Sequence, residues 1–236
     1  MVFTTSISIK ESFWQAIDTS KFSGNPAEDT RLQSLRNISI PQLIKVLEQY
    51  SYVTKIHAIS LNYVCNVIQA GKLKVLLDEI HFEETGDGNP DDSHYNLLKL
   101  FLLGLNESFG ATMLTNTINP RVDALIKNYE NDLRSYPAHV AIGMAGMGTE
   151  CICGPILEEI WAQVQSRKDL EDVLPQLKLE FWGIHTGEID HSHAVRMRNA
   201  IDGAVGESEE SAAQILTGYH LSVKFWDDLL DIFVTL

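Results

Sequence analysis

Three of the eight histidines in this chain, His185, His191 and His193, fall within nine positions, and Asp190 lies among them. Neutral imidazole and carboxylate groups are the usual protein ligands of iron, manganese and zinc. The same residues could equally form a polar helix face exposed to solvent, because a histidine-rich segment is only weak evidence of a metal site. The segment by itself therefore leaves a metal site and a solvated surface as two open interpretations.

Residues of the same types occur in two earlier segments. Glu84 and His94 lie on either side of a turn, and Glu150 lies in a helical stretch of small residues. A site for two metal ions bridged by carboxylates needs about six protein ligands, which several helices direct inward. The chain offers six such residues: Glu84, His94, Glu150, His185, Asp190 and His193.

The segments that carry these residues have apolar side chains at three- and four-residue steps, which is the period of a helix. Helix starts are indicated by residues that cap a first turn or suit its first position: Pro41, Asn89, Pro90, Asn119, Pro120 and Ser208. Gly71 and the turn at 85–90 are typical of helix ends. The pattern predicts helices over 10–19, 39–71, 72–84 and 139–165, one within 175–203, and others beginning near 90, 120 and 209.

The fold expected from this pattern is all-α, with residues 1–236 in a single domain built as one bundle of about seven or eight helices. Two of the helices are expected to be irregular. A break near Tyr50 to Tyr52 would divide the helix over 39–71. Glycines at 143, 146, 148 and 154 indicate close helix contact or a kink in the helix over 139–165.

Composition argues against several classes of partner. Apolar residues make up 44% of the chain and charged residues 21%, which is ordinary for a soluble globular protein. A net charge of −14 argues against nucleic acid and against an anionic membrane surface. The longest apolar run, 97–105, is too short to span a bilayer, and the first ten residues lack a signal-peptide pattern. Three cysteines, an odd number, indicate a reducing compartment, so we expect a cytoplasmic protein.

Taken together, the motifs resemble a known family. The first motif is Glu83-Glu84-x-Gly-x-Gly, with His94 ten residues after Glu84. Glu150 follows later in the chain, and after it comes a helix with His, Asp and His. This set of motifs is similar to that of the haem-oxygenase-like diiron oxidases. These include CADD-like and TenA-like proteins, some of them described as iron-containing redox enzymes. The resemblance covers residues from about 80 to 193.

The resemblance implies a haem-oxygenase-like (TenA-like) helical bundle that binds no haem in this site. It implies two iron ions, or manganese in their place, that activate dioxygen to oxidise an amine, an amino acid or a fatty acid. The partners it implies are therefore dioxygen and a small-molecule substrate. Proteins of this fold often dimerise, so a homodimer is also an expectation.

Ligands carry over from the family residue by residue. Glu84 and His94 match its first carboxylate and first imidazole. Glu150 matches the carboxylate of the middle helix, although Pro155 follows it by five residues instead of four. Further residues could replace or join these ligands: His81, Glu158 and Glu159.

The last metal-binding helix departs from the family pattern by one residue, because four residues instead of three separate His185 from Asp190. On a regular helix Asp190 would lie about 140° around from His185, so both could not easily face one site. A π-turn or local unwinding around Thr186 to Asp190 would realign them. Without it, Glu188 and His191 become the better partners of His185.

Two other functions fit the same bundle. A TenA-like hydrolase of a thiamin-type pyrimidine would use a cysteine nucleophile beside acid or base carboxylates, and Cys151 or Cys153 could serve. A non-catalytic interaction or metal-binding protein would agree with the negative charge. The oxidase is the preferred prediction, because the hydrolase leaves the three clustered histidines unexplained.

Overall fold

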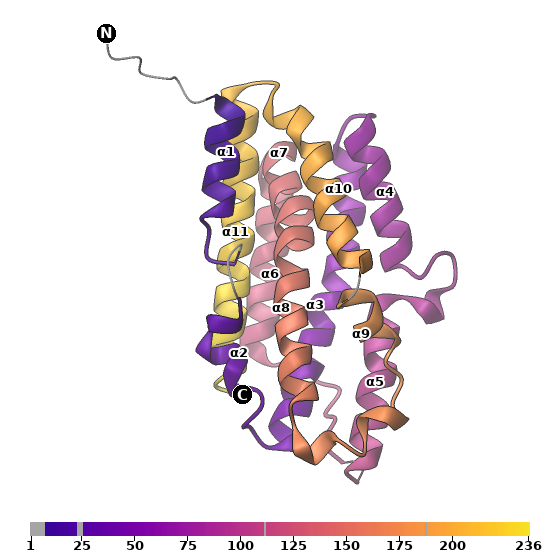
Figure 1. Ribbon diagram of the computed structural model, residues 1–236. Coiled ribbons are helices and arrows are strands. Elements are labelled where there is room, and N and C mark those ends of the chain that lie inside the picture. The colour runs from indigo at the N-terminus through magenta and orange to yellow at the C-terminus, as the bar shows by residue number, and fades with distance from the viewer. Residues whose placement is uncertain (1–7, 23–25, 111, 187) are drawn as a thin grey trace.

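The computed structural model describes residues 8–22, 26–110, 112–186 and 188–236, and the side chains of residues 188–191 lie outside that description. All regular structure in these residues is helical, as predicted (Figure 1). The helices of ten residues or more are α1 (Ile9–Asp18), α3 (Ile40–Val67), α4 (Lys72–Glu84), α5 (His94–Ser108), α6 (Pro120–Ser135), α8 (Thr149–Gln165), α10 (Glu188–Val205) and α11 (Glu209–Phe233). The short α-helices are α2 (Thr30–Ser34), α7 (Ala138–Ala141) and α9 (Glu180–His185). A π-helix, η3 (Ile142–Gly148), and four 3-10 helices complete the described elements: η1 (Pro26–Glu28), η2 (Pro90–Asp92), η4 (Lys168–Leu170) and η5 (Leu174–Gln176).

Several helices begin where the sequence predicts. Ser39, Asn119 and Ser208 each accept a hydrogen bond from a backbone N–H in the first turn of α3, α6 and α11. Two predictions are wrong. Helix α3 continues without a break through 50–52, because its buried stripe also continues there. Asn89 caps only the 3-10 turn η2, and α5 begins at His94.

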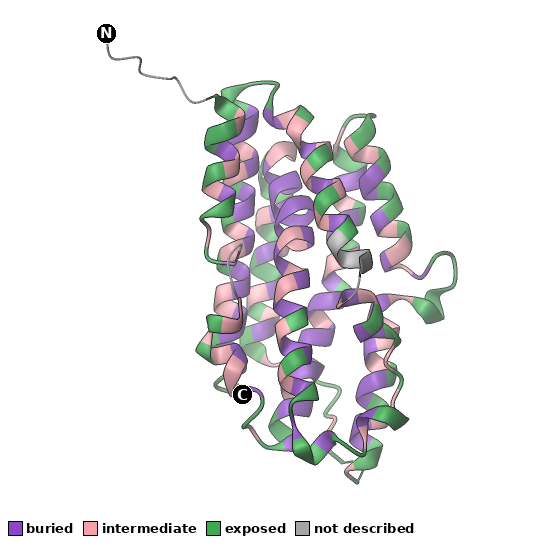
Figure 2. Ribbon diagram, in the orientation of Figure 1, coloured by how far each residue is buried: buried purple, intermediate pink, exposed green. Residues whose placement is uncertain are grey.

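Two pairs of helices lie end to end along one side of the bundle. Helix α4 is followed by α5, and beside them α10 and α9 are stacked in the same way (Figure 1). Helix α3 packs against both α4 and α5, and α10 packs against α4 and α8. Buried residues gather on the faces turned toward the middle of the bundle, and exposed residues lie on its outer surface (Figure 2). Each pair therefore has a break between its two helices, and the two breaks lie at a similar height in the bundle, next to the continuous helix α3.

The glycine-rich part of the predicted helix over 139–165 is the π-helix η3, which lies between α7 and α8. A Cβ atom on Gly143 would lie 2.0 Å from the carbonyl oxygen of Ile215 in α11, and one on Gly218 would lie 2.0 Å from that of Val140. Glycine at these positions lets the two backbones approach each other, which confirms the prediction of close helix contact. Glu150 follows η3 by two residues, and π-helical segments frequently mark functional sites.

One helical run in the described part of the chain, Ala138–Gln165, is long and apolar enough to cross a membrane by length and composition. Its apolar window is 72% buried inside the protein. A helix that is apolar on all sides is also what the core of a bundle requires, so the run is weak evidence of a membrane span.

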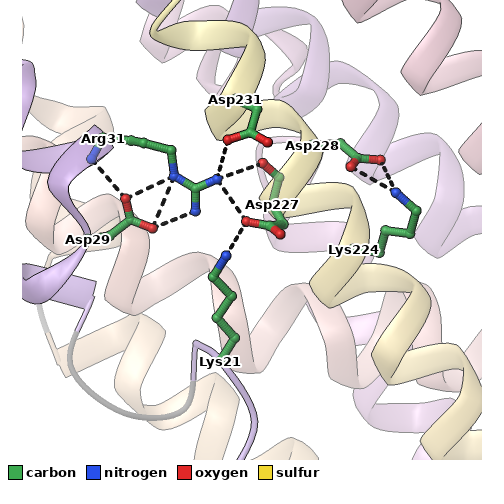
Figure 3. A network of polar contacts seen from close by, with 7 residues as sticks. All are labelled: Lys21, Asp29, Arg31, Lys224, Asp227, Asp228 and Asp231. Atoms are coloured by element: carbon green, nitrogen blue, oxygen red, sulfur yellow. Dashed lines mark hydrogen bonds and ion pairs between the residues drawn. The ribbon is translucent and has the colours of Figure 1, made fainter.

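A polar network joins the N-terminal segment to α11 (Figure 3). The Arg31 guanidinium donates hydrogen bonds to both carboxylate oxygens of Asp29, and to Asp231 Oδ1 at 2.6 Å. It also lies 2.8 Å from Asp227 Oδ1, which Lys21 contacts as well. The hydrogen bonds from Arg31 lower the pKa of Asp29. Burial would raise the pKa of Asp227, but Lys21 and Arg31 outweigh the effect of burial and lower this pKa as well.

Candidate metal centre

A tight turn brings Glu84 and His94 together. Glu84 is the last residue of α4, and His94 is the first residue of α5. Between them Gly86 has a φ of 92°, and a Cβ atom there would lie 2.1 Å from the carbonyl oxygen of Asn89, so the turn requires glycine. The turn places His94 Nδ1 2.9 Å from Glu84 Oε1, with both side chains buried.

His185 is the last residue of α9, and its ring lies against the ring of His94 with a centroid distance of 4.6 Å. Its Nδ1 is 2.7 Å from the carbonyl oxygen of Phe181. A carbonyl oxygen can only accept a hydrogen bond, so Nδ1 carries the proton and Nε2 keeps a lone pair for a metal ion. Histidine ligands are commonly oriented in this way by their second ring nitrogen.

Glu84, His94 and His185 form the first cluster of metal-ligating atoms. Each offers one such atom, and these atoms lie within 4.8 Å of one another. Burial would raise the pKa of Glu84, but His94 and His57 outweigh burial and lower this pKa to about 2. Burial and then His94 lower the pKa of His185 to about 4. Near neutral pH Glu84 is therefore ionised and His185 is neutral, which are the protonation states that metal coordination requires.

Glu150, His57 and His193 form a second cluster beside the first. His57 Nε2 is 3.0 Å from Glu150 Oε1 and 3.8 Å from Glu84 Oε1, so His57 lies between the two carboxylates. His193 Nδ1 is 3.6 Å from Glu150 Oε2, while its Nε2 is 2.6 Å from Glu83 Oε2. Burial would raise the pKa of Glu150, but the neighbouring imidazoles of His193 and His57 outweigh burial and lower it. Each cluster thus contains one buried carboxylate and two imidazoles.

A small cavity of about 30 Å³ is lined by residues of both clusters, among them Glu84, Glu150 and His57. Tyr50 and Trp226 contribute to the rest of its wall. The cavity has room for roughly two water molecules. Two ionised carboxylates in so enclosed a place need compensating positive charge, which metal cations supply.

The predicted metal-binding helix is interrupted directly after His185. Helix α9 ends there, and α10 begins as a separate helix at Glu188. The prediction of local unwinding is thereby confirmed, whereas the π-helix of this protein lies in a different segment, η3. The side chains of Glu188, Asp190 and His191 lie outside the described residues, so the choice of Asp190 as a ligand stays a prediction.

The other carboxylates of α8 belong to neither cluster. Glu158 is exposed, and Glu159 accepts a hydrogen bond from Gln163. His81 is half-buried in α4, one turn before Glu84, and interacts electrostatically with Glu84 and His57, so its role as a further ligand stays a prediction. Of the glutamates in α8, Glu150 is therefore the one that lies beside imidazoles, those of His57 and His193.

A family model described as iron-containing redox enzyme matches residues 44–227 of the sequence. The chain belongs to this family. The matched residues run from α3 into α11 and include both clusters. The family description implies iron, and carboxylate with imidazole is a donor set that iron accepts. No curated protein matches the sequence.

Two crystal structures of a CADD-like protein of unknown function from Nostoc punctiforme PCC 73102 are similar to the structure of this chain. One has a TM-score of 0.72 at 19% sequence identity and covers 96% of each chain. The other has a TM-score of 0.71 at 17% identity and covers 96% of this chain and 95% of that chain. At these identities the likeness shows the fold alone, and it confirms the predicted CADD-like helical bundle.

Two residues of the centre, His57 and Glu83, are not among the ligands predicted from the sequence. His57 follows Tyr50 by seven residues and Val53 by four, so it continues the buried stripe of α3. A histidine in an otherwise apolar stripe is the signal that could have revealed it. Glu83 contacts His193 across 110 residues of sequence, and nothing in the local pattern indicates that pairing.

Proposed function

We propose that this member of the family is a non-haem diiron oxidase that uses dioxygen to oxidise a small organic substrate, such as an amine, an amino acid or a fatty acid. One observation carries the proposal: there are two clusters, each with one buried carboxylate and two imidazoles, and residues of both line the same small cavity. A single metal ion would need only one of these clusters.

The first cluster would hold one ion and the second cluster the other. Asp190, in the same helix as His193, is proposed as a further ligand of the second ion. Manganese accepts the same donors, so the selection of iron depends on geometry and availability.

When bound, two iron ions would supply electrons for dioxygen and open coordination positions. The residues of the chain orient the ligands and exclude water. Glu83 accepts a hydrogen bond from His193 Nε2, which leaves Nδ1 turned toward Glu150. Burial of both carboxylates keeps bulk water away and strengthens every electrostatic interaction in the centre.

The alternative of a cysteine hydrolase is less well supported at Cys151. Burial raises the pKa of this thiol to about 12, and the charge of Glu150 contributes to the shift. The thiolate is the nucleophilic form, so a thiol with so high a pKa is a poor nucleophile near neutral pH. A non-catalytic metal-binding protein would hold the same ions without consuming dioxygen, and the experiment below separates it from an oxidase.

The test measures metal content and oxygen consumption of the full chain and of two matched variants. After growth in iron-rich medium we expect two iron ions per chain and an oxygen-dependent change in the optical spectrum. Glu150→Ala should bind its iron at least about tenfold more weakly, because it removes a buried ligand. Glu158→Ala removes an exposed glutamate of the same helix and should behave like the wild type.

Three outcomes would contradict the proposal. If protein purified from cells grown in iron-rich medium contained no iron, its function could not depend on bound iron. Iron that binds without any oxygen consumption would favour a metal-binding protein. Hydrolysis of a thiamin-type pyrimidine that is abolished by Cys151→Ser or Cys153→Ser would favour the hydrolase.

A further inference from the structure

A tyrosine and a cysteine form part of the cavity wall without belonging to either cluster. Tyr50 of α3 and Cys153 of α8 both line the cavity, together with Glu84 and His57. The Tyr50 hydroxyl lies 3.5 Å from Cys153 Sγ. Because sulfur is only a weak hydrogen-bonding group, this contact contributes little to the stability of a buried phenol.

Tyr50 is deeply buried, with 3% of its surface exposed. Burial, with a contribution from Cys153, holds the pKa of its hydroxyl well above the usual range. The phenol is therefore neutral, and any oxidation of its ring must remove a proton together with an electron. Oxidation of this kind needs a strong oxidant close by, which the neighbouring clusters would provide once iron and dioxygen are bound.

A continuous set of ring contacts joins Tyr50 to the first cluster. The Tyr50 ring centroid lies 6.4 Å from that of Phe181, and the Phe181 ring lies 4.2 Å from the His185 ring. On its other side Tyr50 lies 6.1 Å from Trp226. An electron that leaves Tyr50 thus has a short path through buried side chains to a metal-ligating imidazole.

We propose that Tyr50 and Cys153 are a modification site, at which the metal centre and dioxygen join the two side chains through a thioether bond. The bond forms between Cys153 Sγ and the ring carbon of Tyr50 that is ortho to the hydroxyl. That carbon adjoins the carbon bearing the hydroxyl, which is the group that Cys153 Sγ contacts. This inference rests on the proposed function, because dioxygen reduced at the centre is the oxidant.

The reaction balances with one molecule of dioxygen. The S–H bond of Cys153 and one ring C–H bond of Tyr50 break, and one C–S bond forms. The two electrons and two protons that are released reduce dioxygen to hydrogen peroxide. The product protein is lighter by two hydrogen atoms, and its thioether, unlike a disulfide, resists thiol reductants.

The experiment uses the full chain, loaded with ferrous iron in the absence of oxygen and then exposed to dioxygen. After treatment with a thiol reductant, intact-mass spectrometry should show a product that has lost two hydrogen atoms. Proteolysis should give one peptide that joins the segments around Tyr50 and Cys153. A sample kept free of oxygen should retain the full mass, and a disulfide between Cys151 and Cys153 would be reversed by the reductant.

Three variants identify the atoms involved. Tyr50→Phe removes only the hydroxyl, and Cys153→Ser replaces only the sulfur, so both should bind iron and keep the full mass after exposure to dioxygen. Cys65→Ala is the control, because Cys65 lies elsewhere in α3 and does not line the cavity, and it should lose two hydrogen atoms like the wild type.

The iron content and oxygen uptake of the same samples separate the two proposals. If the wild type binds iron and consumes dioxygen but keeps its full mass, the thioether is overturned and the diiron oxidase stands. The thioether is likewise overturned, and the oxidase retained, if Cys153→Ser still loses two hydrogen atoms. If the wild type binds no iron or consumes no dioxygen, both proposals are overturned.

Discussion

His57 lies between two buried carboxylates that belong to different clusters, with Nε2 3.0 Å from Glu150 and 3.8 Å from Glu84. It therefore lies within 4 Å of a carboxylate in each cluster. In the metal-free protein it offsets part of the negative charge of both glutamates, whose pKa values its presence lowers. In the proposed diiron centre, the same position would make it a ligand or the residue that orients one.

Replacing His57 by alanine should weaken iron binding by about 10- to 100-fold at the second cluster, because a ligand or its orienting partner is lost. The iron content should then fall from two ions per chain toward one, as measured by anaerobic titration with ferrous iron. His220→Ala removes an exposed histidine of α11 and should keep both ions. Equal affinity in the His57 variant and the wild type would show that His57 has no role in metal binding.

At the scale of single residues, the sequence predicts those candidate ligands that belong to recognisable local patterns. Glu84 and His94 are separated by a turn whose glycines mark it, and His185 and His193 share one histidine-rich segment. His57 could not be found in this way, because α3 offers no second ligand near it. Its role becomes visible only when the fold brings α3 between α4 and α8.

At the scale of helices, the first cluster is assembled from helix ends. Glu84 ends α4, His94 begins α5, and His185 ends α9. The sequence predicts the first interruption from its turn residues and the second from a spacing that is one residue too long for a regular helix. The π-helix η3 could not be placed from sequence, because glycines indicate close contact without revealing the hydrogen-bond pattern.

Gly143→Ala should lower the free energy of unfolding by about 1–3 kcal/mol, because the added Cβ would overlap the backbone of α11 at Ile215. Gly203→Ala is the matched change in α10, where nothing lies within 4 Å of the added atom. It should raise the free energy of unfolding by roughly 0.5–1 kcal/mol, through helix propensity. Urea denaturation of the metal-free proteins measures both, and equal effects of the two changes would contradict the tight contact between η3 and α11.

At the scale of the whole molecule, helical periodicity was enough to predict an all-α bundle. It could not predict which segments that are distant in sequence contact each other. Arg31 joins α2 to α11 through Asp231, across 200 residues of sequence. The pKa values of Asp29 and Asp227 are lowered in the folded protein. Their contribution to stability is therefore fully present above the unfolded pKa of about 4, and it is lost as the pH falls through the lower folded values.

Arg31→Met should lower the free energy of unfolding of the metal-free protein by roughly 1–2 kcal/mol at neutral pH, since the ion pairs are only partly buried. The difference from the wild type should shrink at about pH 3, where protonation of the carboxylates has begun. Lys224→Met, which breaks the exposed pair with Asp228 drawn in the same view (Figure 3), should change stability by less than about 0.5 kcal/mol. A difference between Arg31→Met and the wild type that stays constant with pH would contradict this account.

A cavity of about 30 Å³ admits dioxygen or water but is far smaller than an amine, an amino acid or a fatty acid chain. In the proposed oxidase, an organic substrate would therefore need the residues around the cavity to move apart before it reached the two clusters. Motions of this kind take microseconds to milliseconds and often limit turnover. The rate of substrate oxidation should then fall as solvent viscosity rises, whereas dioxygen consumed in the absence of substrate should be insensitive to viscosity.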